Sequence, residues 1–337
     1  MSKALVFLFI CFFSLKIEAQ QSDFNTINFE KADAVANKYK GESLESLPVL
    51  SYNLTNSLST DVEKFRAIYK WVCANIENDY YAYVKNKKLR KRLAKDSLKL
   101  ASWNADFTRK TFRKLLDDKK TVCTGYAYLV KELANLSGIK CEIIEGYGRT
   151  TDVNIGELSI PNHSWNAVQL NTKWYLCDAT WSSGIYDLNE YKFDFDYNDG
   201  YFLTDPNLFI KKHYPLETKW LLTDKIIPIN DFLNAPIVYV TTFKEGIIPM
   251  QPAMLHLDVK QNQEIIFSLK ELTPINENDI TVEITSGTIK NWVDPIVNRN
   301  NEGLLEVKHT FNNRGSYDFH IKLKEEYLVT YTVKVKK

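Results

Sequence analysis

The feature that most constrains the fold is a change in hydrophobic periodicity near Pro236. Before this residue, apolar side chains recur at helical spacing in several segments, whereas after it apolar and polar side chains alternate as in half-buried β-strands. Single cores rarely keep growing past roughly 250 residues, so a chain of 337 residues with two such patterns predicts two domains. We expect an α+β domain over residues 20–235 and an all-β domain over residues 236–337.

The C-terminal part predicts a β-sandwich. Between Tyr317 and Leu323, alternate apolar side chains lie on one face of a strand, and Asp318, His320 and Lys322 lie on the other. Similar alternating runs cover residues 254–259, 264–269, 279–284, 304–311 and 327–335. About seven strands without a cysteine are typical of an immunoglobulin-like sandwich that lacks the disulfide.

The charge balance excludes one class of function. The chain has 43 Lys and Arg against 42 Asp and Glu, whereas a dedicated nucleic-acid binder usually has a clear basic excess. We therefore expect no nucleic-acid partner. Residues 85–120 are a local exception, with fourteen basic and four acidic side chains. A solvated helical face is the favoured interpretation of this stretch, and attraction of acidic substrates or wall polymers is the alternative.

The N-terminus has the pattern of a signal peptide over residues 1–19. Lys3 precedes an apolar run from Ala4 to Leu15, and the small residue Ala19 fits a cleavage site. The run is too short for a transmembrane helix, which needs about 20 apolar residues. Removal of residues 1–19 leaves 41 basic and 41 acidic side chains, because Lys3, Lys16 and Glu18 are lost. The sequence therefore predicts a secreted or periplasmic protein without a transmembrane segment.

Helices and strands alternate in the N-terminal part. Thr60 and Glu63 form a capping box ahead of apolar residues at helical spacing, and a second amphipathic helix begins near Cys123 and ends at Ser137-Gly138. Three strand-like runs follow, at residues 140–148, 163–170 and 173–180. A short polar turn at Asn171-Thr172 joins the last two runs, which predicts an antiparallel hairpin.

Three residues in these elements form a candidate catalytic constellation. Cys123 begins a helix, where the partial positive charge and free N–H groups lower the pKa of a thiol. His163 begins a strand and is the candidate general acid and base, and Asp178 on the adjoining strand can orient its imidazole. The hairpin brings residues 178–181 alongside His163. Each residue alone is usually structural, but the order of helix cysteine, strand histidine and adjacent-strand aspartate is far more specific.

The other cysteines and histidines have structural interpretations. Cys73 is expected as a small buried residue, and His213 as a packing residue. Cys141 and Cys177 lie on the strands that flank the His163 strand, so we expect them to be buried and too far apart for a disulfide. No metal-ligand spacing is present, so we expect neither a metal ion nor another cofactor.

These motifs resemble the transglutaminase-like superfamily of papain-type thiol enzymes, in which a helix-start cysteine precedes a His-x-Trp strand and an Asp-x-Thr strand. The flanking residues are similar to the branch that contains the kyphoscoliosis peptidase and related cytokinesis proteins. The similarity rests on Gly146-Tyr147, His163-Ser164-Trp165-Asn166, Asp178-Ala179-Thr180-Trp181, Ser183-Gly184, Tyr201-Phe202-Leu203-Thr204-Asp205-Pro206, His213-Tyr214-Pro215 and Trp220-Leu221-Leu222. It extends over roughly residues 60–250.

The resemblance implies a core of helices packed on an antiparallel sheet, with Cys123 as nucleophile, His163 as general acid and base, and Asp178 as orienting residue. The main-chain N–H of Cys123 is expected to form part of an oxyanion site. The expected activity is that of an exported enzyme that acts on peptide or protein amides through an acyl-thioester, with a peptidase as first choice and a transamidase as alternative. A catalytically inactive surface protein that binds an envelope or surface partner through its β-sandwich is the rival from a different class.

Overall fold

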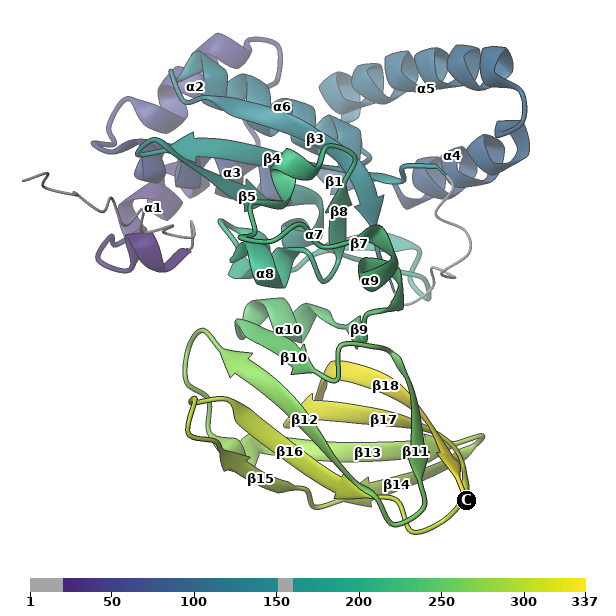
Figure 1. Cartoon of the computed structure of the whole chain (residues 1–337). Helices are drawn as coiled ribbons and strands as arrows, with labels where there is room; N and C mark the ends of the chain where they lie inside the picture. Colours follow the sequence, from purple (N-terminus) through teal and green to yellow (C-terminus); the bar gives the residue numbers. More distant parts are fainter. Residues whose placement is uncertain (1–20, 151–159) are drawn as a thin grey trace, which may run out of the picture.

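The computed structural model describes residues 21–150 and 160–337, and it consists of a helix-rich α+β part followed by two packed β-sheets (Figure 1). This arrangement confirms the predicted fold class. The predicted signal peptide, residues 1–19, lies outside the described residues. Among the helices of the described part, none has both the length and the apolar character needed to cross a membrane.

The α+β part begins with helices and continues with an antiparallel sheet. Its first helices are α1 (Glu30–Lys38), α2 (Leu47–Thr55), α3 (Asp61–Asn75), α4 (Tyr80–Leu93), α5 (Ser97–Asp118) and α6 (Cys123–Leu136). The main sheet has the order β5-β4-β3-β8 and contains β3 (Cys141–Gly148), β4 (His163–Leu170), β5 (Lys173–Cys177) and β8 (His213–Pro215). Smaller elements are the pairs β1 (Glu77–Asn78) with β2 (Lys120–Thr121) and β6 (Gly184–Asp187) with β7 (Lys192–Phe195), and the helices α7 (Ala179–Ser183), α8 (Pro206–Phe209) and α9 (Ile229–Asn234).

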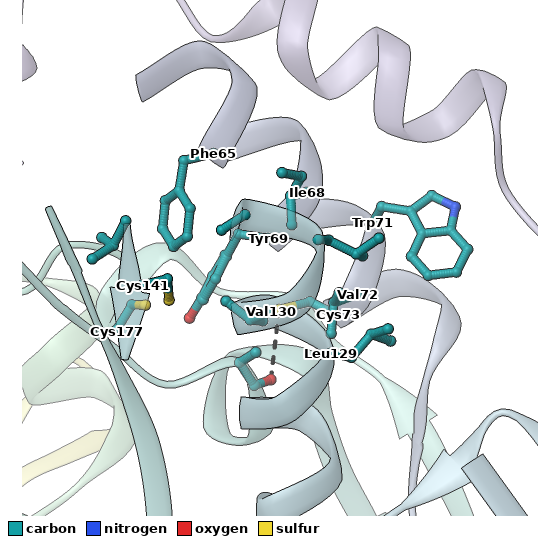
Figure 2. Packing of buried hydrophobic residues seen from close by; sticks show 14 of the residues in the cluster. Phe65, Ile68, Tyr69, Trp71, Val72, Cys73, Leu129, Val130, Cys141 and Cys177 are labelled. Carbon is teal, nitrogen blue, oxygen red and sulfur yellow. Dashed lines mark hydrogen bonds between the residues drawn. The ribbon is translucent and has the colours of Figure 1, made fainter. Parts of the chain in front are cut away.

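Helices α3 and α6 form the centre of this part. The Thr60 and Glu63 capping box is present at the start of α3, and the apolar residues that follow it at helical spacing are buried. Figure 2 shows side chains of both helices packed in one cluster with Cys73, Cys141 and Cys177. All three cysteines are buried and free, as expected from the sequence. The Cys73 thiol lies 3.5 Å from the carbonyl oxygen of Ala179, so the core contacts the start of α7 directly.

The β4–β5 hairpin has the predicted turn, but its second strand is shorter than expected. Asn171 and Thr172 adopt positive φ angles of 48° and 69°, which suits a tight two-residue turn between antiparallel strands. The predicted strand to Thr180 was wrong, because β5 ends at Cys177 and α7 begins at Ala179. Asp178 therefore lies between a strand and a helix rather than within a strand.

The basic stretch of residues 85–120 folds into a helical hairpin of α4 and α5. The side chains of Trp103 and Asn86 connect the two helices through a hydrogen bond of 2.9 Å. In Figure 1 this hairpin projects from the body of the α+β part. None of the residues of α4 is fully buried, which agrees with the expected solvated helical face.

The C-terminal part is a sandwich of two sheets with a shared apolar core. One sheet has the order β10-β12-β16-β15, and the other has the order β11-β18-β17-β13-β14, with β9 also paired to β18. The elements are β9 (Ile237–Val238), α10 (Val240–Lys244), β10 (Ile247–Gln251), β11 (His256–Lys260), β12 (Glu264–Glu271), β13 (Ile280–Ser286), β14 (Ile289–Val293), β15 (Ile296–Arg299), β16 (Leu305–Thr310), β17 (Gly315–Leu323) and β18 (Glu326–Lys336).

One predicted surface residue of the sandwich is buried. Phe319 and Ile321 point into the core as expected, but Lys322, assigned to the polar face, is only 3% exposed. Its ammonium group lies 3.7 Å from the Glu283 carboxylate and 4.3 Å from the ring centre of Trp292. The neighbouring strands β13 and β14 thus supply a carboxylate and an aromatic cover that the alternation within one strand cannot reveal.

The two parts are in contact. Tyr201 and Leu208 of the α+β part belong to the same apolar cluster as the core of the sandwich. Tyr201 stacks on Phe243 of α10 with ring centres 4.4 Å apart. The domain boundary between residues 235 and 236 stays a prediction.

Candidate active site

Cys123 is the first residue of α6, as the sequence predicted. The first N–H groups of a helix have no carbonyl partner one turn earlier, so they present partial positive charge to the sulfur of Cys123. Gly125 permits this helix start, because a Cβ atom there would lie 2.0 Å from Oγ1 of Thr121. Cys123 is a partly exposed residue in the lining of a cleft, so a substrate can approach it.

His163 is the first residue of β4 and is 8% exposed. Its Nε2 atom lies 2.6 Å from Oδ2 of Asp178, which leaves Nδ1 as the nitrogen for Cys123. The imidazole stacks on the indole of Trp181, with ring centres 4.6 Å apart and an interplanar angle of 17°. On the other side, Gly148 makes room for the histidine, because a Cβ atom there would lie 2.9 Å from Cβ of His163.

Asp178 is fully buried and has two roles at once. It is the N-cap of α7, where Oδ1 accepts hydrogen bonds from the main-chain N–H groups of Thr180 at 2.9 Å and Trp181 at 3.3 Å. Its Oδ2 atom accepts the bond from His163. The structure therefore combines a helix-capping position and a position beside His163 in one carboxylate.

The pKa values of the three groups favour a thiolate next to an imidazolium. Burial alone would raise the pKa of Cys123, but the hydrogen bond and charge of His163 outweigh it and lower this pKa. Burial likewise opposes protonation of His163, yet Asp178 and Cys123 raise its pKa to about 10. The pKa of Asp178 is held well below its usual range, because His163 and His213 outweigh its burial. Each of these shifts is in the direction that favours the charged form of its group.

His213 was expected as a packing residue, and that interpretation is incomplete. Its ring does stack on Phe209 of α8, with centres 3.9 Å apart. Its Nε2 atom also lies 3.0 Å from Oδ2 of Asp178, the same oxygen that binds His163. Burial lowers the pKa of His213 to about 4 despite Asp178, so it is a neutral donor beside a charged carboxylate. The His-Tyr-Pro motif drew attention to His213 in the sequence. The motif does not show that His213 lies at the site, because this depends on the pairing of strand β8 with strand β3.

Replacement of His213 tests whether its hydrogen bond to Asp178 affects the reactivity of Cys123. We expect His213→Ala to slow alkylation of Cys123 by iodoacetamide at pH 6 by about two- to fivefold, because Asp178 loses one neutral hydrogen bond of roughly 1 kcal/mol. His213→Gln should retain most of the rate, since its side-chain amide can donate from the position of Nε2. Stopped-flow or mass-spectrometric labelling rates give the comparison, and equal rates for His213→Ala and the wild type would contradict it.

Three of these groups could in principle serve as metal ligands. His163, Asp178 and His213 each offer one ligand atom, and these atoms lie within 4.8 Å of one another. The nitrogen of His163 is 2.6 Å from the carboxylate oxygen, whereas two ligands of a tetrahedral ion, each ~2.0–2.2 Å from the metal, are more than 3 Å apart. The contacts therefore have the geometry of hydrogen bonds rather than of a coordination shell.

A cleft of about 580 Å³ leads to this constellation. Its lining includes Cys123, Thr124, His163 and Ser164, together with residues of α4 and α5 of the helical hairpin. This is large enough for a peptide segment or another drug-sized ligand. Cys123 is the one cysteine among the described lining residues, so it borders a space in which a substrate can bind.

Comparisons with known proteins agree with these observations. Residues 49–179 match the family model of the transglutaminase-like superfamily, and this range includes Cys123, His163 and Asp178. Kyphoscoliosis peptidase from Homo sapiens is 32% identical over 241 residues, which are 71% of this chain and 32% of that protein. Hillarin from Drosophila melanogaster is 28% identical over 238 residues, 66% of this chain and 26% of hillarin. The chain therefore spans about a third or less of the length of these relatives.

Proposed function

Residues 49–179 make this chain a member of the transglutaminase-like superfamily, in the branch of kyphoscoliosis peptidase, and we propose that it is a cysteine enzyme acting on peptide or protein amide bonds. One observation carries the proposal. A partly exposed helix-start cysteine in the lining of a cleft lies beside a histidine whose far nitrogen is 2.6 Å from a buried carboxylate. That is the arrangement that nucleophilic catalysis by a thiol requires.

In the proposed acylation step, the Cys123 sulfur attacks the amide carbonyl carbon and the C–N bond breaks. The His163 imidazolium gives its proton to the departing amine, so an acyl-thioester and a neutral imidazole remain. The free N–H of Cys123 at the start of α6 is a donor for the oxyanion that develops. Asp178 holds the His163 ring in place through Nε2 and stabilises its positive charge.

In the proposed deacylation step, water attacks the thioester carbonyl while His163 accepts one proton from it. The C–S bond then breaks, a carboxylic product leaves, and the thiolate and imidazolium are restored. A primary amine in place of water would give transamidation. Hydrolysis is the first choice, because the sequence gives no sign of how water would be excluded in favour of an amine.

Product analysis tests the reaction class. The protein is incubated with a library of glutamine-containing peptides, with and without a labelled primary amine, and products are identified by mass spectrometry. New peptide termini that carry the elements of water indicate a peptidase, and incorporation of the amine with loss of ammonia indicates a transamidase. The matched control is Cys123→Ala, and product formation that persists in this variant would overturn the proposal.

The pH dependence of amide turnover should be bell-shaped. The rate should rise as Cys123 loses its proton, on a limb below the free-thiol range of about 8.5, since the pKa of this thiol is lowered. It should fall near pH 10 as His163 loses the proton that the leaving amine needs, because the pKa of His163 is raised to about 10. Initial rates between pH 5 and 11 measure both limbs. A descending limb near pH 6.5 would contradict the Asp178–His163 ion pair.

We further propose that residues 1–19 direct export and are removed after Ala19. The observation in support is the short apolar run after Lys3, which is followed by the small residue Ala19. Expression of the full chain with a C-terminal tag, followed by N-terminal sequencing of the exported fraction, should give Gln20 as the first residue. An intact N-terminus on the exported protein would contradict cleavage.

A further inference from the structure

The part of the cleft lining that α4 contributes, called the α4 wall below, is basic. Helix α4 contributes Lys87, Arg90 and Lys91 to the lining, and these positions share one helix face because they are three and four residues apart. The acidic side chain among the described lining residues is Glu145 of β3. Lys87 and Arg90 alone give two positive charges against the one carboxylate of Glu145 among the described lining residues.

Arg90 is held in place by a hydrogen bond to the main chain of another lining residue. Its Nη1 atom donates a hydrogen bond of 2.7 Å to the carbonyl oxygen of Pro161, two residues before His163. Neither Arg90 nor Lys87 forms an ion pair with a carboxylate in residues 21–150 and 160–337. The guanidinium is half-buried, and its pKa is lowered by burial against the opposing effects of Cys123 and Glu145, so its charge acts on the space around the thiol.

A helical face that is merely exposed to solvent would not need a half-buried arginine bonded to a main-chain carbonyl. Lys88 is also on α4 and exposed, but it is not among the described lining residues of the cleft. Arg90, by contrast, is half-buried and held by a main-chain carbonyl, and it forms no ion pair with a carboxylate of residues 21–150 and 160–337. A carboxylate of a bound ligand can pair with such a cation.

We propose that the cleft selects acidic peptides, with Arg90 and Lys87 recognising a carboxylate of the substrate next to the amide that reacts with Cys123. This inference rests on the proposed function, because it assigns the substrate class of the same site. The carboxylate belongs to an aspartate, a glutamate or a chain terminus near the reacting residue. Arg90 is the main determinant, since its planar guanidinium is already oriented and can bind a carboxylate through two hydrogen bonds.

The charge of the α4 wall can be measured without a known substrate. Iodoacetate and iodoacetamide alkylate the same thiol, but only iodoacetate is an anion. The iodoacetate-to-iodoacetamide rate ratio at Cys123 should fall about two- to fivefold in Arg90→Gln and in Lys87→Gln, as expected for one charge removed at ~8 Å in a water-like medium. Lys88→Gln is the matched control and should leave the ratio unchanged. Raising the salt concentration should lower the wild-type ratio as well.

Peptide competition then tests recognition itself. Peptides of equal length that carry glutamate, glutamine or lysine beside a central glutamine are compared for protection of Cys123 against iodoacetamide. The glutamate peptide should protect best, and Arg90→Gln should remove its advantage.

The outcomes separate the two proposals. Equal ratios in all variants and equal protection by all peptides, with selective labelling of Cys123 intact, would overturn the acidic-peptide inference and leave the enzyme proposal standing. If neither iodoacetate nor iodoacetamide labels Cys123 selectively, the enzyme proposal is overturned, and the inference with it. Protection by a wall polymer but by none of the peptides would also overturn the inference.

Discussion

His163→Ala is expected to lower amide turnover by at least 100-fold, because the leaving amine loses its proton donor and general acid–base catalysis is typically worth about 10²–10⁴ in rate. The same change should move the midpoint of Cys123 alkylation upwards, towards the free-thiol range of about 8.5. The direction follows from the hydrogen bond and charge of His163, which oppose burial and lower the pKa of Cys123 in the intact protein.

Alkylation at pH 6 should fall less than the change in ionisation suggests. A free thiol of pKa about 8.5 is only ~0.3% ionised at pH 6, but a thiolate of higher pKa is also the better nucleophile, so we expect a decrease of roughly tenfold. The exposed His256→Ala variant of the sandwich is the matched control for removal of an imidazole. Identical midpoints in His163→Ala and wild type would show that the two side chains do not form an ion pair.

Asp178→Ala should affect both activity and stability. The carboxylate is fully buried, caps α7 and accepts hydrogen bonds from two imidazoles, so its removal leaves several buried donors without acceptors. We expect a loss of about 2–4 kcal/mol in the free energy of unfolding, from one helix cap and unsatisfied buried groups. Six of the seven tryptophans precede residue 236, so tryptophan fluorescence during urea unfolding reports mainly on the affected part.

Asp178→Asn separates the two roles of the carboxylate. Its amide oxygen can still cap α7, so stability should fall less than in Asp178→Ala. Its NH₂ group would instead donate a hydrogen bond to Nε2 of His163. The neutral imidazole then carries its proton on Nδ1, the nitrogen that faces Cys123. Because Nδ1 can no longer accept the proton of the thiol, Cys123 stays protonated. Turnover should fall about 10³-fold or more, as it does when orienting carboxylates are lost from serine-protease triads. Equal losses of stability in the two variants would contradict the capping role.

Much of the fold could be predicted because it is encoded locally. The capping box and apolar spacing of α3, the start of α6 at Cys123 and the β4–β5 turn each depend on residues within a few positions of one another. The membership in the transglutaminase-like superfamily, inferred from short motifs, is confirmed by the match over residues 49–179. The catalytic roles of Cys123, His163 and Asp178 stay predictions, although the structure brings His163 and Asp178 into direct contact.

The sequence by itself therefore determined the elements, their order and the residue types available for chemistry. Only the tertiary structure decided that His213 shares the Asp178 carboxylate, across 35 positions of the chain, and that Arg90 reaches Pro161 across 71. It also decided that Lys322 is buried beneath Trp292. Periodicity and capping reveal which face of one element is apolar, but a contact between distant elements depends on how their faces pack together, and no local pattern records that.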